Sequence, residues 1–504
     1  MAKKQQLILV MTDTQRVDMV GAYGLPAMKT PALDRLASEG VRCERAYTCQ
    51  PVCGPARAAL FTGTWPHINN GWSNGMALDA RSRSVGQRVR DAGIHAAYVG
   101  KWHLDGGDYF GEGVCPDGWD PKYWYDMKCY LDQLTPEQRV ASRQEKTMYE
   151  GEGIPADFTF GHRVASRAVD FLSRHGEEPF LLVVSFDEPH GPFLAPKKFI
   201  DQHADTKLPW RENMADPLAD KPEHQRAWAG KALHREPAPG DAAYQSYFAC
   251  NSFVDSEIGR VLDAIDRHAP DALVIYTADH GDMLGSHRLT NKGPVMYDEI
   301  TRIPFLVRWP GVIPPGSVSA NLVSHIDIVP TILDAFEIPQ PATLHGRSML
   351  PMWRNPATVT NAEVFIEFGR YEIDHDGFGG FQPVRCVRDA RYKLVINLLC
   401  TDELYDMEQD PGELTNLIES PAHAAARDRL HDRLITWMNE TRDPFRGYYW
   451  VRRPWRSDAP PPTWDFTGFT RQREPEPGET RQLDYDTGLP YAQATRRKIV
   501  PDYA

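Results

Sequence analysis

Cys53 stands where the residue types and their spacing best suit chemistry on an anion. It belongs to Cys53-Gly54-Pro55-Ala56-Arg57, directly before an apolar run that predicts a helix. A Cys one residue before a helix, with a Pro near the first helical position, faces the positive end of the helix dipole, where anions bind. Arg57 follows one turn later on the same face and can reach the same point. The alternative is a half-buried structural Cys beside a helix start.

Four short apolar runs each end in polar or ionisable residues, which predicts buried strands that lead into one site. The runs begin at positions 7, 95, 180 and 273, and their continuous apolar character is typical of a parallel sheet covered on both faces. In such sheets ligands bind beyond the carboxyl ends of the strands. We therefore expect the polar residues after the four runs to converge, namely Asp13, Lys101, His103, His190, Asp279 and His280.

Two of these segments resemble the signatures of type I sulfatases, members of the alkaline phosphatase superfamily. Cys53-x-Pro55-x-Arg57, followed by Leu-x-Thr-Gly at 60–63, resembles the first signature, and Gly-Lys-Trp-His at 100–103 resembles the second. The resemblance runs from about residue 5 to about residue 420. It implies a sulfuric ester hydrolase in which Cys53 is oxidised after translation to Cα-formylglycine.

The resemblance also implies one bound divalent metal ion, usually Ca²⁺, with Mn²⁺ and Mg²⁺ as alternatives. Asp13, Thr14, Asp279, His280 and the formylglycine at position 53 occupy the ligand positions of the family. Carboxylate oxygens suit hard cations of this kind. Sulfatases carry a second Asp where this chain has Thr14. The chain therefore places less negative charge around the metal, and one ligand and the identity of the metal stay open.

The resemblance further implies catalytic roles for residues that touch the sulfate. One hydroxyl of the hydrated formylglycine attacks sulfur, and the resulting sulfate ester collapses when the other hydroxyl loses its proton. By the same resemblance, Arg57 and Lys101 stabilise the charged oxygens, and His103 is the base for the collapse. His190 and Lys292 neutralise charge on the leaving alcohol, and one of them donates its proton.

Two further polar residues are weaker candidates. Asn74 matches a polar position near the metal in part of the superfamily, and His287 lies in the loop that carries Lys292. We expect Asn74 to lie near the metal, and His287 to be structural or to face the substrate.

The closest alternative is a phosphonate monoester or phosphodiester hydrolase of the same superfamily, which shares the formylglycine and the metal site. That branch also has a residue other than Asp after the first metal Asp, as well as extended C-terminal arms. Its members tend to carry Tyr and Thr where this chain has Lys101 and His103, so the sequence favours a sulfatase. From another class, a non-catalytic binding protein on the same scaffold would keep an unmodified thiol at position 53.

The pattern of elements predicts an α/β fold with a mostly parallel central sheet flanked by helices, of the alkaline phosphatase and sulfatase type. Helical patterns lie between the apolar runs, at 30–37, 160–172 and 244–265. Thr30, ahead of Pro31, is the expected N-cap of the first of these helices.

Near residue 360 the pattern changes to strands at 362–368 and 392–397 and an amphipathic helix at 422–439. We therefore expect a smaller C-terminal α+β subdomain and then a tail without core periodicity. The expected divisions are a sulfatase catalytic domain at 1–360, the subdomain at 361–445, and an extended aromatic and Pro-rich tail at 446–504.

Composition and charge limit the partners. The 504 residues carry 56 basic and 69 acidic side chains, a net charge of −13, which argues against nucleic acid as a general partner. The first apolar run is too short to span a membrane, and no secretory signal is evident. The eight cysteines are sparse and lack close-paired metal spacing. We expect mostly reduced thiols in a cytoplasmic protein without a membrane partner.

The substrate is expected to be a small-molecule or oligosaccharide sulfate ester, with a sulfated sugar preferred and aryl sulfates also hydrolysed. Long loops at 105–158 and 200–240 should shape its access, and aromatic rings beside polar groups are common walls of sugar sites. The rings could equally pack the insertions. The rings concerned are Trp119, Tyr123, Trp124, Tyr125, Trp210 and Trp228.

Two protein partners are also expected. The first is a formylglycine-generating enzyme, which the oxidation of Cys53 requires. The second is another copy of the chain, because the aromatic residues and Arg of the tail at 446–504 suit an arm laid on a protein surface. We expect this tail to dock on the catalytic domain or on a neighbouring subunit of a homo-oligomer.

Overall fold

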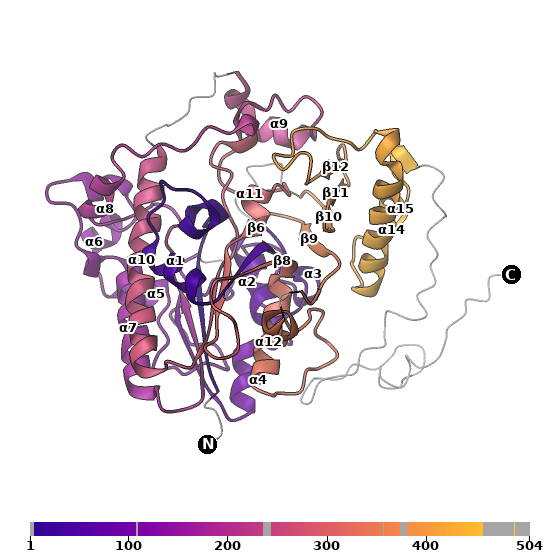
Figure 1. The fold of residues 1–504 in the computed structure, drawn as a ribbon. Helices are drawn as coiled ribbons and strands as arrows, with labels where there is room; N and C mark the ends of the chain where they lie inside the picture. Colours follow the sequence, from indigo (N-terminus) through magenta and orange to yellow (C-terminus); the bar gives the residue numbers. More distant parts are fainter. Residues whose placement is uncertain are drawn as a thin grey trace.

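A mostly parallel sheet forms the centre of the molecule, as the sequence predicts (Figure 1). The structure is a computed structural model that describes residues 5–106, 109–234, 243–355, 357–372, 381–456 and 488. Within these residues the sheet has eight strands in the order β3-β4-β1-β5-β7-β2-β6, with β8 beside β2. Its strands are β1 (Gln6–Thr12), β2 (Val41–Tyr47), β3 (His95–Gly100), β4 (Phe180–Ser185), β5 (Leu273–Ala278), β6 (Arg302–Ile303), β7 (Phe305–Arg308) and β8 (Ser317–Ser324).

The four predicted strands lie side by side and run in the same direction. β3 pairs with β4, β4 with β1, and β1 with β5, each in parallel register. Every residue of β1, β4 and β5 is buried, because helices cover both faces of the sheet. The carboxyl ends of these strands therefore meet at one edge, where the predicted polar residues begin.

Two layers of helices enclose this sheet and explain the continuous apolar strands. The even residues of β1, such as Ile8 and Val10, pack with the first layer, and the odd residues Leu7, Leu9 and Met11 pack with the second. The first layer contains α1 (Pro31–Glu39), α7 (Phe160–His175) and α10 (Ala243–His268), and the second contains α2 (Cys53–Thr62), α4 (Val85–Asp91) and α12 (Ile328–Ala335) (Figure 1). The predicted helices at 30–37, 160–172 and 244–265 are confirmed.

The capping of α1 differs from the prediction. Thr30 occupies the N-cap position, but its side chain makes no capping hydrogen bond. Its hydroxyl instead accepts a hydrogen bond from Gly21 N and donates one to Asp34. The carboxylate of Asp255, on α10, accepts the backbone N–H groups of Ala32 and Leu33. A long-range side chain therefore satisfies donors that the local sequence assigned to Thr30.

A second, antiparallel sheet follows the change of pattern near residue 360. Its order is β12-β11-β10-β9, and α14 (Ala424–Glu440) packs on β10 and β11. The predicted strands and helix of this region are confirmed, whereas the strands β10 and β12 were not predicted. The exact division between domains stays a prediction. The strands are β9 (Val364–Phe368), β10 (Val384–Arg388), β11 (Tyr392–Asn397) and β12 (Glu403–Asp406).

Short helices occupy the segments predicted as long loops and other connections. The ring packing predicted as one of two alternatives is confirmed for Trp119 and Trp124, which are 5% and 8% exposed and pack against Tyr98. Trp210, by contrast, is exposed. The short helices are α3 (Pro66–Asn69), α5 (Met127–Asp132), α6 (Pro136–Ala141), α8 (Lys197–Gln202), α9 (Glu223–Ala229), α11 (Asp298–Thr301), α13 (Leu350–Arg354) and α15 (Tyr448–Val451).

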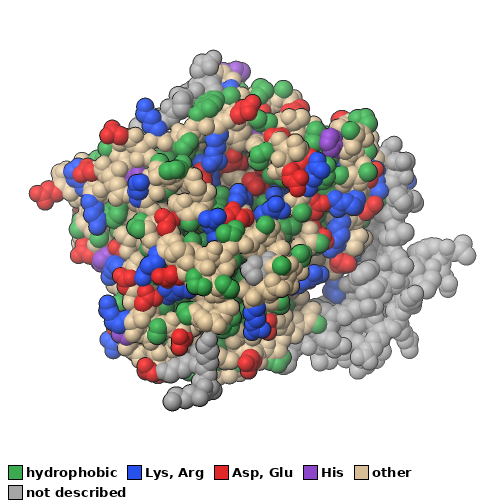
Figure 2. Space-filling model, viewed as in Figure 1, with side chains coloured by type: hydrophobic (Ala, Val, Ile, Leu, Met, Phe, Trp, Pro, Cys, Tyr) green, Lys and Arg blue, Asp and Glu red, His purple; other side chains and the backbone are tan. Residues whose placement is uncertain are grey.

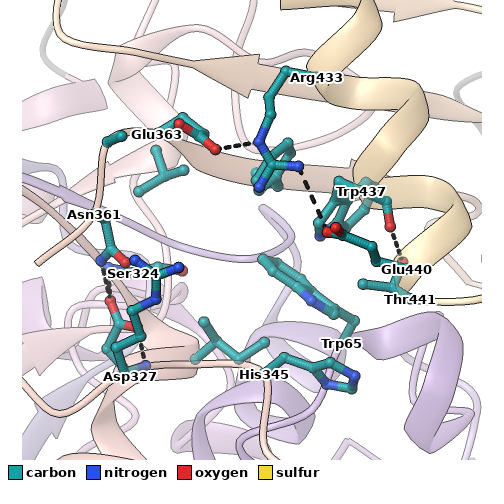
Figure 3. A pocket seen from close by; sticks show the side chains of 15 residues that line it. Trp65, Ser324, Asp327, His345, Asn361, Glu363, Arg433, Trp437, Glu440 and Thr441 are labelled. Carbon is teal, nitrogen blue, oxygen red and sulfur yellow. Dashed lines mark hydrogen bonds and ion pairs between the residues drawn. The ribbon is translucent and has the colours of Figure 1, made fainter. Parts of the chain in front are cut away.

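One cavity of about 240 Å³ lies between α14 and β9, beside the end of α2 (Figure 3). Trp65 and Trp437 form part of its wall, with ring centroids 5.0 Å apart. Arg433 pairs there with Glu363 and with Glu440. None of the predicted site residues lines this cavity. The predicted chemistry therefore lies outside this cavity.

The surface carries both signs of charge. Basic and acidic side chains are interspersed over the face that Figure 2 shows. Among the described residues, no helix combines the length and the apolar character needed to cross a bilayer.

The beginning of the tail packs on the second sheet's helix. Trp450 is 1% exposed, and its carbonyl lies 2.7 Å from His431 Nε2 on α14. Trp455 donates its indole N–H to Asp402, which also pairs with Arg453. Residues up to 456 thus pack on the 361–445 subdomain and not on the catalytic domain as predicted. Docking on a neighbouring subunit stays a prediction, and 457–487 and 489–504 lie outside the described residues.

Candidate active site

The predicted site residues come together at the carboxyl ends of β1, β3, β4 and β5. Asp13 follows β1, and Asp279 and His280 follow β5. Lys101 follows β3, and its ammonium Nζ lies 2.9 Å from Asp13 Oδ2. The convergence expected from the four apolar runs is therefore real, although the segments are up to 267 residues apart, from Asp13 to His280.

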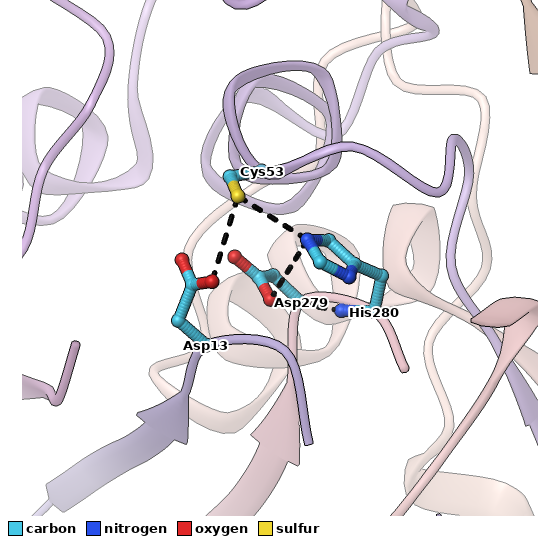
Figure 4. A group of neighbouring side chains, drawn as sticks. All are labelled: Asp13, Cys53, Asp279 and His280. Carbon is cyan, nitrogen blue, oxygen red and sulfur yellow. Dashed lines mark hydrogen bonds and ion pairs between the residues drawn. The ribbon is translucent and has the colours of Figure 1, made fainter. Parts of the chain in front are cut away.

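Cys53 is the first residue of α2, one residue later in helix register than the sequence analysis placed it. Its thiol is almost fully buried and lies 3.5 Å from Asp13 Oδ1 and 3.2 Å from His280 Nε2 (Figure 4). It also lies 3.0 Å from Lys292 Nζ. The next backbone N–H, of Gly54, donates to Asn74 Oδ1 at 2.8 Å. Asn74 thus caps the helix that carries the thiol, beside the expected metal position.

The charges around Cys53 favour its thiolate. Burial and Asp13 raise the pKa of the thiol, but Lys292, Lys101 and a hydrogen bond with His190 more than offset them, so that the net pKa is lowered. Burial lowers the pKa of Lys292, but the Cys53 charge raises it above its ordinary value. Position 53 is therefore a place where negative charge is stabilised.

Arg57 is fully buried and is held entirely by the protein. Its Nη2 lies 3.0 Å from Asp13 Oδ2, and its Nε lies 3.1 Å from Asp279 Oδ2. Its Nη1 donates to the Lys101 carbonyl at 2.7 Å and to the Ser185 hydroxyl at 2.9 Å. The guanidinium therefore joins α2 to four strand ends and fixes the two carboxylates relative to Cys53.

Four residues form a compact set that could hold a metal ion. Donor atoms of Asp13, Cys53, Asp279 and His280 all lie within 4.8 Å of one another, and all four residues are buried (Figure 4). His280 Nδ1 lies 2.8 Å from the Gly281 carbonyl, which can only accept, so that Nδ1 carries the proton and Nε2 is free to bind a metal. Burial lowers the pKa of His280, which favours the neutral imidazole that metals require.

The two carboxylates of this set have opposite pKa shifts. Burial raises the pKa of Asp13, but Lys101, His190 and Lys292 offset this and hold it well below its ordinary value. Burial and the charge of Asp13 raise the pKa of Asp279 to about 7, because its neighbours His280 and Arg57 compensate only in part. A divalent cation at this position would offset the excess negative charge.

Thr14 lies beside these carboxylates. Its hydroxyl donates to Asp13 Oδ1 at 2.7 Å, and its backbone N–H donates to Asp279 Oδ1 at 3.0 Å. Lys292 Nζ lies 3.3 Å from the same hydroxyl oxygen. The residue adopts φ 60°, the left-handed region, which points both groups at the carboxylates. Thr14 thus orients the predicted ligands and has its hydroxyl lone pair directed toward Lys292.

Lys101 connects the metal cluster to residues after β4. Its Nζ lies 3.0 Å from Asp187 Oδ1 as well as 2.9 Å from Asp13. Burial lowers the pKa of Lys101, but these two carboxylates outweigh burial and raise it well above its ordinary value. The side chain is therefore a permanent cation within reach of Cys53.

Tyr109 is a site residue that the sequence analysis did not identify. Its hydroxyl lies 2.6 Å from Asp187 Oδ1 and 3.0 Å from His190 Nδ1, and its ring lies 4.0 Å from Lys101 Nζ. His190 Nδ1 also lies 2.9 Å from the Gly191 carbonyl, which cannot donate. Nδ1 therefore carries the proton, and Nε2 of His190 is free for the reaction. No periodicity or motif in the 105–158 segment marks Tyr109.

His103 is a buried, uncharged imidazole. It adopts φ 59°, and its ring centroid lies 5.4 Å from that of Tyr109. Burial, with the neighbouring charges of Lys101 and Arg57, lowers the pKa of His103 well below its ordinary value. Its buried Nδ1 has no hydrogen-bond partner among the described residues. The side chain is thus ready to accept a proton.

His287, predicted as structural or substrate-facing, is structural. It is fully buried, its Nδ1 lies 2.7 Å from Asp216 Oδ2, and its ring stacks on Tyr297 at 3.7 Å. Tyr371, by contrast, reaches the site from the segment after β9. Its carbonyl accepts the backbone N–H of Asn74 at 3.0 Å. Burial raises the pKa of its hydroxyl, which Lys292 lowers and Cys53 raises further.

The strand ends, α2 and the loop that carries Lys292 bring together a buried thiol, two carboxylates and three buried cations, an arrangement suited to the hydrolysis of an anionic ester. Residues 5–338 match the family model Sulfatase, and residues 285–440 match the model N-sulphoglucosamine sulphohydrolase, C-terminal. The chain belongs to the sulfatase family and is a sulfuric ester hydrolase.

Curated relatives extend over nearly the whole chain. "Uncharacterized sulfatase YidJ" from Escherichia coli (strain K12) is 45% identical over 97% of this chain and 97% of its own length. An N-acetylglucosamine-6-O-sulfatase from Bacteroides thetaiotaomicron is 24% identical and covers 88% of this chain and 87% of its own.

Solved structures share the fold but do not separate the two predicted activities. A protein in complex with its substrate D-glucosamine-2-N,6-O-disulfate superposes with a TM-score of 0.71 at 22% identity, over 88% of this chain and 99% of that one. The phosphonate monoester hydrolase of Agrobacterium radiobacter superposes with a TM-score of 0.73 at 23% identity, over 87% and 96%.

Proposed function

We propose that this sulfatase hydrolyses the sulfate ester of a sugar, and that aryl sulfates serve as additional substrates. The observation that supports a sulfatase over a phosphonate monoester hydrolase is the pair Lys101 and His103 beside Cys53, in place of Tyr and Thr. Two similar proteins support a sugar substrate. One is named N-acetylglucosamine-6-O-sulfatase, and the other was solved in complex with its substrate D-glucosamine-2-N,6-O-disulfate. The products are the free alcohol and hydrogen sulfate, formed with one water.

Cys53 is proposed to act as Cα-formylglycine, made by a formylglycine-generating enzyme. Asp13, Asp279 and His280 would hold one divalent cation, Ca²⁺, next to position 53, and Thr14 would orient Asp13. When bound, this cation would lower the pKa of a hydroxyl at position 53 and offset the two carboxylates. The buried, oxygen-rich donor set supports a hard cation, with Mn²⁺ and Mg²⁺ as alternatives.

Lys101 and Lys292 are proposed to bind the sulfate oxygens. Both are buried cations, and Lys292 Nζ lies 3.0 Å from the Cys53 side chain. Arg57 is proposed to position Asp13 and Asp279, because four of its five N–H donors bond to protein groups. The fifth donor, on Nη2, is left for the oxygens that the resemblance assigns to Arg57.

Two histidines are proposed to move protons. His103 accepts a proton at the stage that releases sulfate, since burial and two cations keep it neutral. His190, with a proton on each ring nitrogen, donates the Nε2 proton to the leaving oxygen, while its Nδ1–H is held by the Gly191 carbonyl and the Tyr109 hydroxyl. Tyr109 is thus a positioning residue for His190.

The mass of the tryptic peptide that contains Cys53 tests the modification. Formylglycine is lighter than Cys, and an unmodified thiol throughout would favour the binding-protein alternative. Cys53→Ala should fold but lose turnover completely. Cys115 packs against the core between the central sheet and the second helix layer, outside the site, so Cys115→Ala should keep both its fold and its turnover. Full activity of Cys53→Ala would contradict the mechanism.

A kinetic comparison tests the choice between the two activities. Under the same conditions, kcat/KM for 4-nitrophenyl sulfate and for a sulfated monosaccharide should exceed that for a phenyl phosphonate monoester. A higher kcat/KM for the phosphonate would favour the alternative hydrolase. If sulfate is released from aryl sulfates but from none of a panel of sulfated mono- and disaccharides, a sugar substrate is excluded.

The proposed setting is a homo-oligomer in the cytoplasm. The packing of Trp450 and Trp455 on α14 supports an arm that runs along the protein surface. Deletion of 457–504 should lower the sedimentation coefficient more than the lost mass explains. If the deletion leaves the oligomeric state unchanged, the tail does not contribute to assembly.

A further inference from the structure

A second group of potential metal ligands lies at the other end of the central sheet. His95 is the first residue of β3, His175 is the last residue of α7, and Glu178 lies in the turn before β4. Donor atoms of these three residues lie within 4.8 Å of one another. We propose that His95, His175 and Glu178 form a binding site for Zn²⁺ or a similar transition-metal ion, separate from the catalytic centre.

Each imidazole has one nitrogen held by a neighbouring side chain. His95 Nε2 lies 2.8 Å from Asp120 Oδ2, and His175 Nε2 lies 2.8 Å from the Tyr123 hydroxyl. Such contacts to the second ring nitrogen orient metal-binding histidines and fix their tautomer. They leave Nδ1 of each ring for an ion.

The carboxylate and the two rings lie close together. His175 Nδ1 lies 3.2 Å from Glu178 Oε2, whereas the hydrogen bond of the His95 ring to Asp120 is made by its Nε2. The two imidazole centroids are 4.7 Å apart. An ion would take the place of the proton that His175 and Glu178 share, and would leave His175 Nε2–H donating to Tyr123.

The backbone of this site is fixed before any ion binds. Gln6, at the start of β1, donates from its Nε2 to the carbonyls of Gly176 and Glu178, at 2.7 and 2.9 Å. A side chain at Gly176 would meet the carbonyl of His268 at 2.3 Å, so that this turn packs directly on α10. The turn that presents Glu178 is therefore held from two sides.

The donor types select the ion. Two imidazole nitrogens and one carboxylate oxygen suit Zn²⁺, Ni²⁺ or Cu²⁺, whereas Ca²⁺ and Mg²⁺ prefer sets in which oxygen donors predominate. The side chains of His95 and His175 are 23% and 18% exposed, and that of Glu178 is 57% exposed, so an ion can enter from solvent. Water would complete its coordination.

The proposed site is independent of catalysis. β3 separates His95 from Lys101, and six strand residues span about 20 Å. The site would instead join β3, α7 and the start of β4, and so stabilise the base of the fold.

Titration of the full-length protein with Zn²⁺, after saturation with Ca²⁺, tests the proposal. The wild type should bind one more Zn²⁺ per chain than His95→Gln or His175→Gln, and Glu178→Gln should weaken that binding at least tenfold. His162→Gln is the matched control, because His162 also lies on α7, is 26% exposed, and pairs with Glu257 outside the cluster. It should bind like the wild type.

Co²⁺ supplies a second measurement. The wild type should show the intense visible absorption of a tetrahedral nitrogen and oxygen site, and the two His→Gln variants should lack it while keeping native circular dichroism and sulfatase activity. Equal Zn²⁺ stoichiometry and equal Co²⁺ spectra in the wild type and His175→Gln would overturn the proposal and leave the cluster as a hydrogen-bonded network.

Discussion

Replacing Arg57 by Met should destabilise the metal-free protein, and a bound cation should largely reverse this loss. In the native structure, Arg57 pairs with both Asp13 and Asp279, and all three side chains are fully buried. Met keeps the unbranched aliphatic part of the side chain but leaves two buried carboxylates without this partner. Breaking a buried pair by removing one member costs about 3–5 kcal/mol.

This cost can be converted into a melting temperature. At about 2.1 cal/mol/K per residue, 504 residues have an unfolding entropy of about 1 kcal/mol/K. In EDTA at pH 8, Arg57→Met should therefore melt about 3–5 °C below the wild type in differential scanning calorimetry. Saturating Ca²⁺ should narrow the gap by at least half, because the ion supplies positive charge to the same two carboxylates.

Arg16→Met is the matched control. Arg16 is also buried and pairs with Asp18 at 2.6 Å, but neither residue belongs to the metal cluster. Its loss of stability should be the same with and without Ca²⁺. If Arg57→Met is as stable as the wild type in EDTA, or if Ca²⁺ narrows both gaps equally, the reasoning about Arg57 and the cation is refuted.

Three further predictions concern the same site and its surroundings. Because Asp279 has a pKa of about 7 in the fold and an ordinary one when unfolded, the metal-free protein should lose stability as the pH rises from 6 to 8. Ca²⁺ should flatten this dependence in thermal scans, and an equal slope with and without the ion would contradict the assignment. Tyr109→Phe should lower kcat about tenfold for sugar sulfates, which need a proton donor, but little for 4-nitrophenyl sulfate. Tyr125→Phe, which loses only a hydrogen bond to Gln133, should slow neither, and equal losses on both substrates would argue against positioning of His190. Trp119→Ala should lower the free energy of unfolding by about 3–5 kcal/mol in chemical denaturation and leave KM unchanged. A raised KM with unchanged stability would instead indicate that the ring contacts the substrate.

The apolar runs of the sequence suffice to locate the central strands and most of the site. They predict β1, β3, β4 and β5, because few polar residues fit within a strand that is buried on both faces. The residues directly after those runs, such as Asp13 and Lys101, then had to share one edge of a parallel sheet. The spacing from Cys53 to Arg57 placed both on one face of a helix, which the structure confirms.

Only the tertiary structure decided which groups complete the contacts. Tyr109 meets His190 although 80 residues separate them in the chain, from 110 to 189, and nothing periodic marks its position. Asp255 caps α1 in place of Thr30 for the same reason. Hydrogen bonds of this kind depend on where distant segments pack, and local sequence patterns carry no record of that. The rings of Trp119 and Trp124 show it as well: their types suit both a sugar site and a core, and their packing against Tyr98 places them in the core.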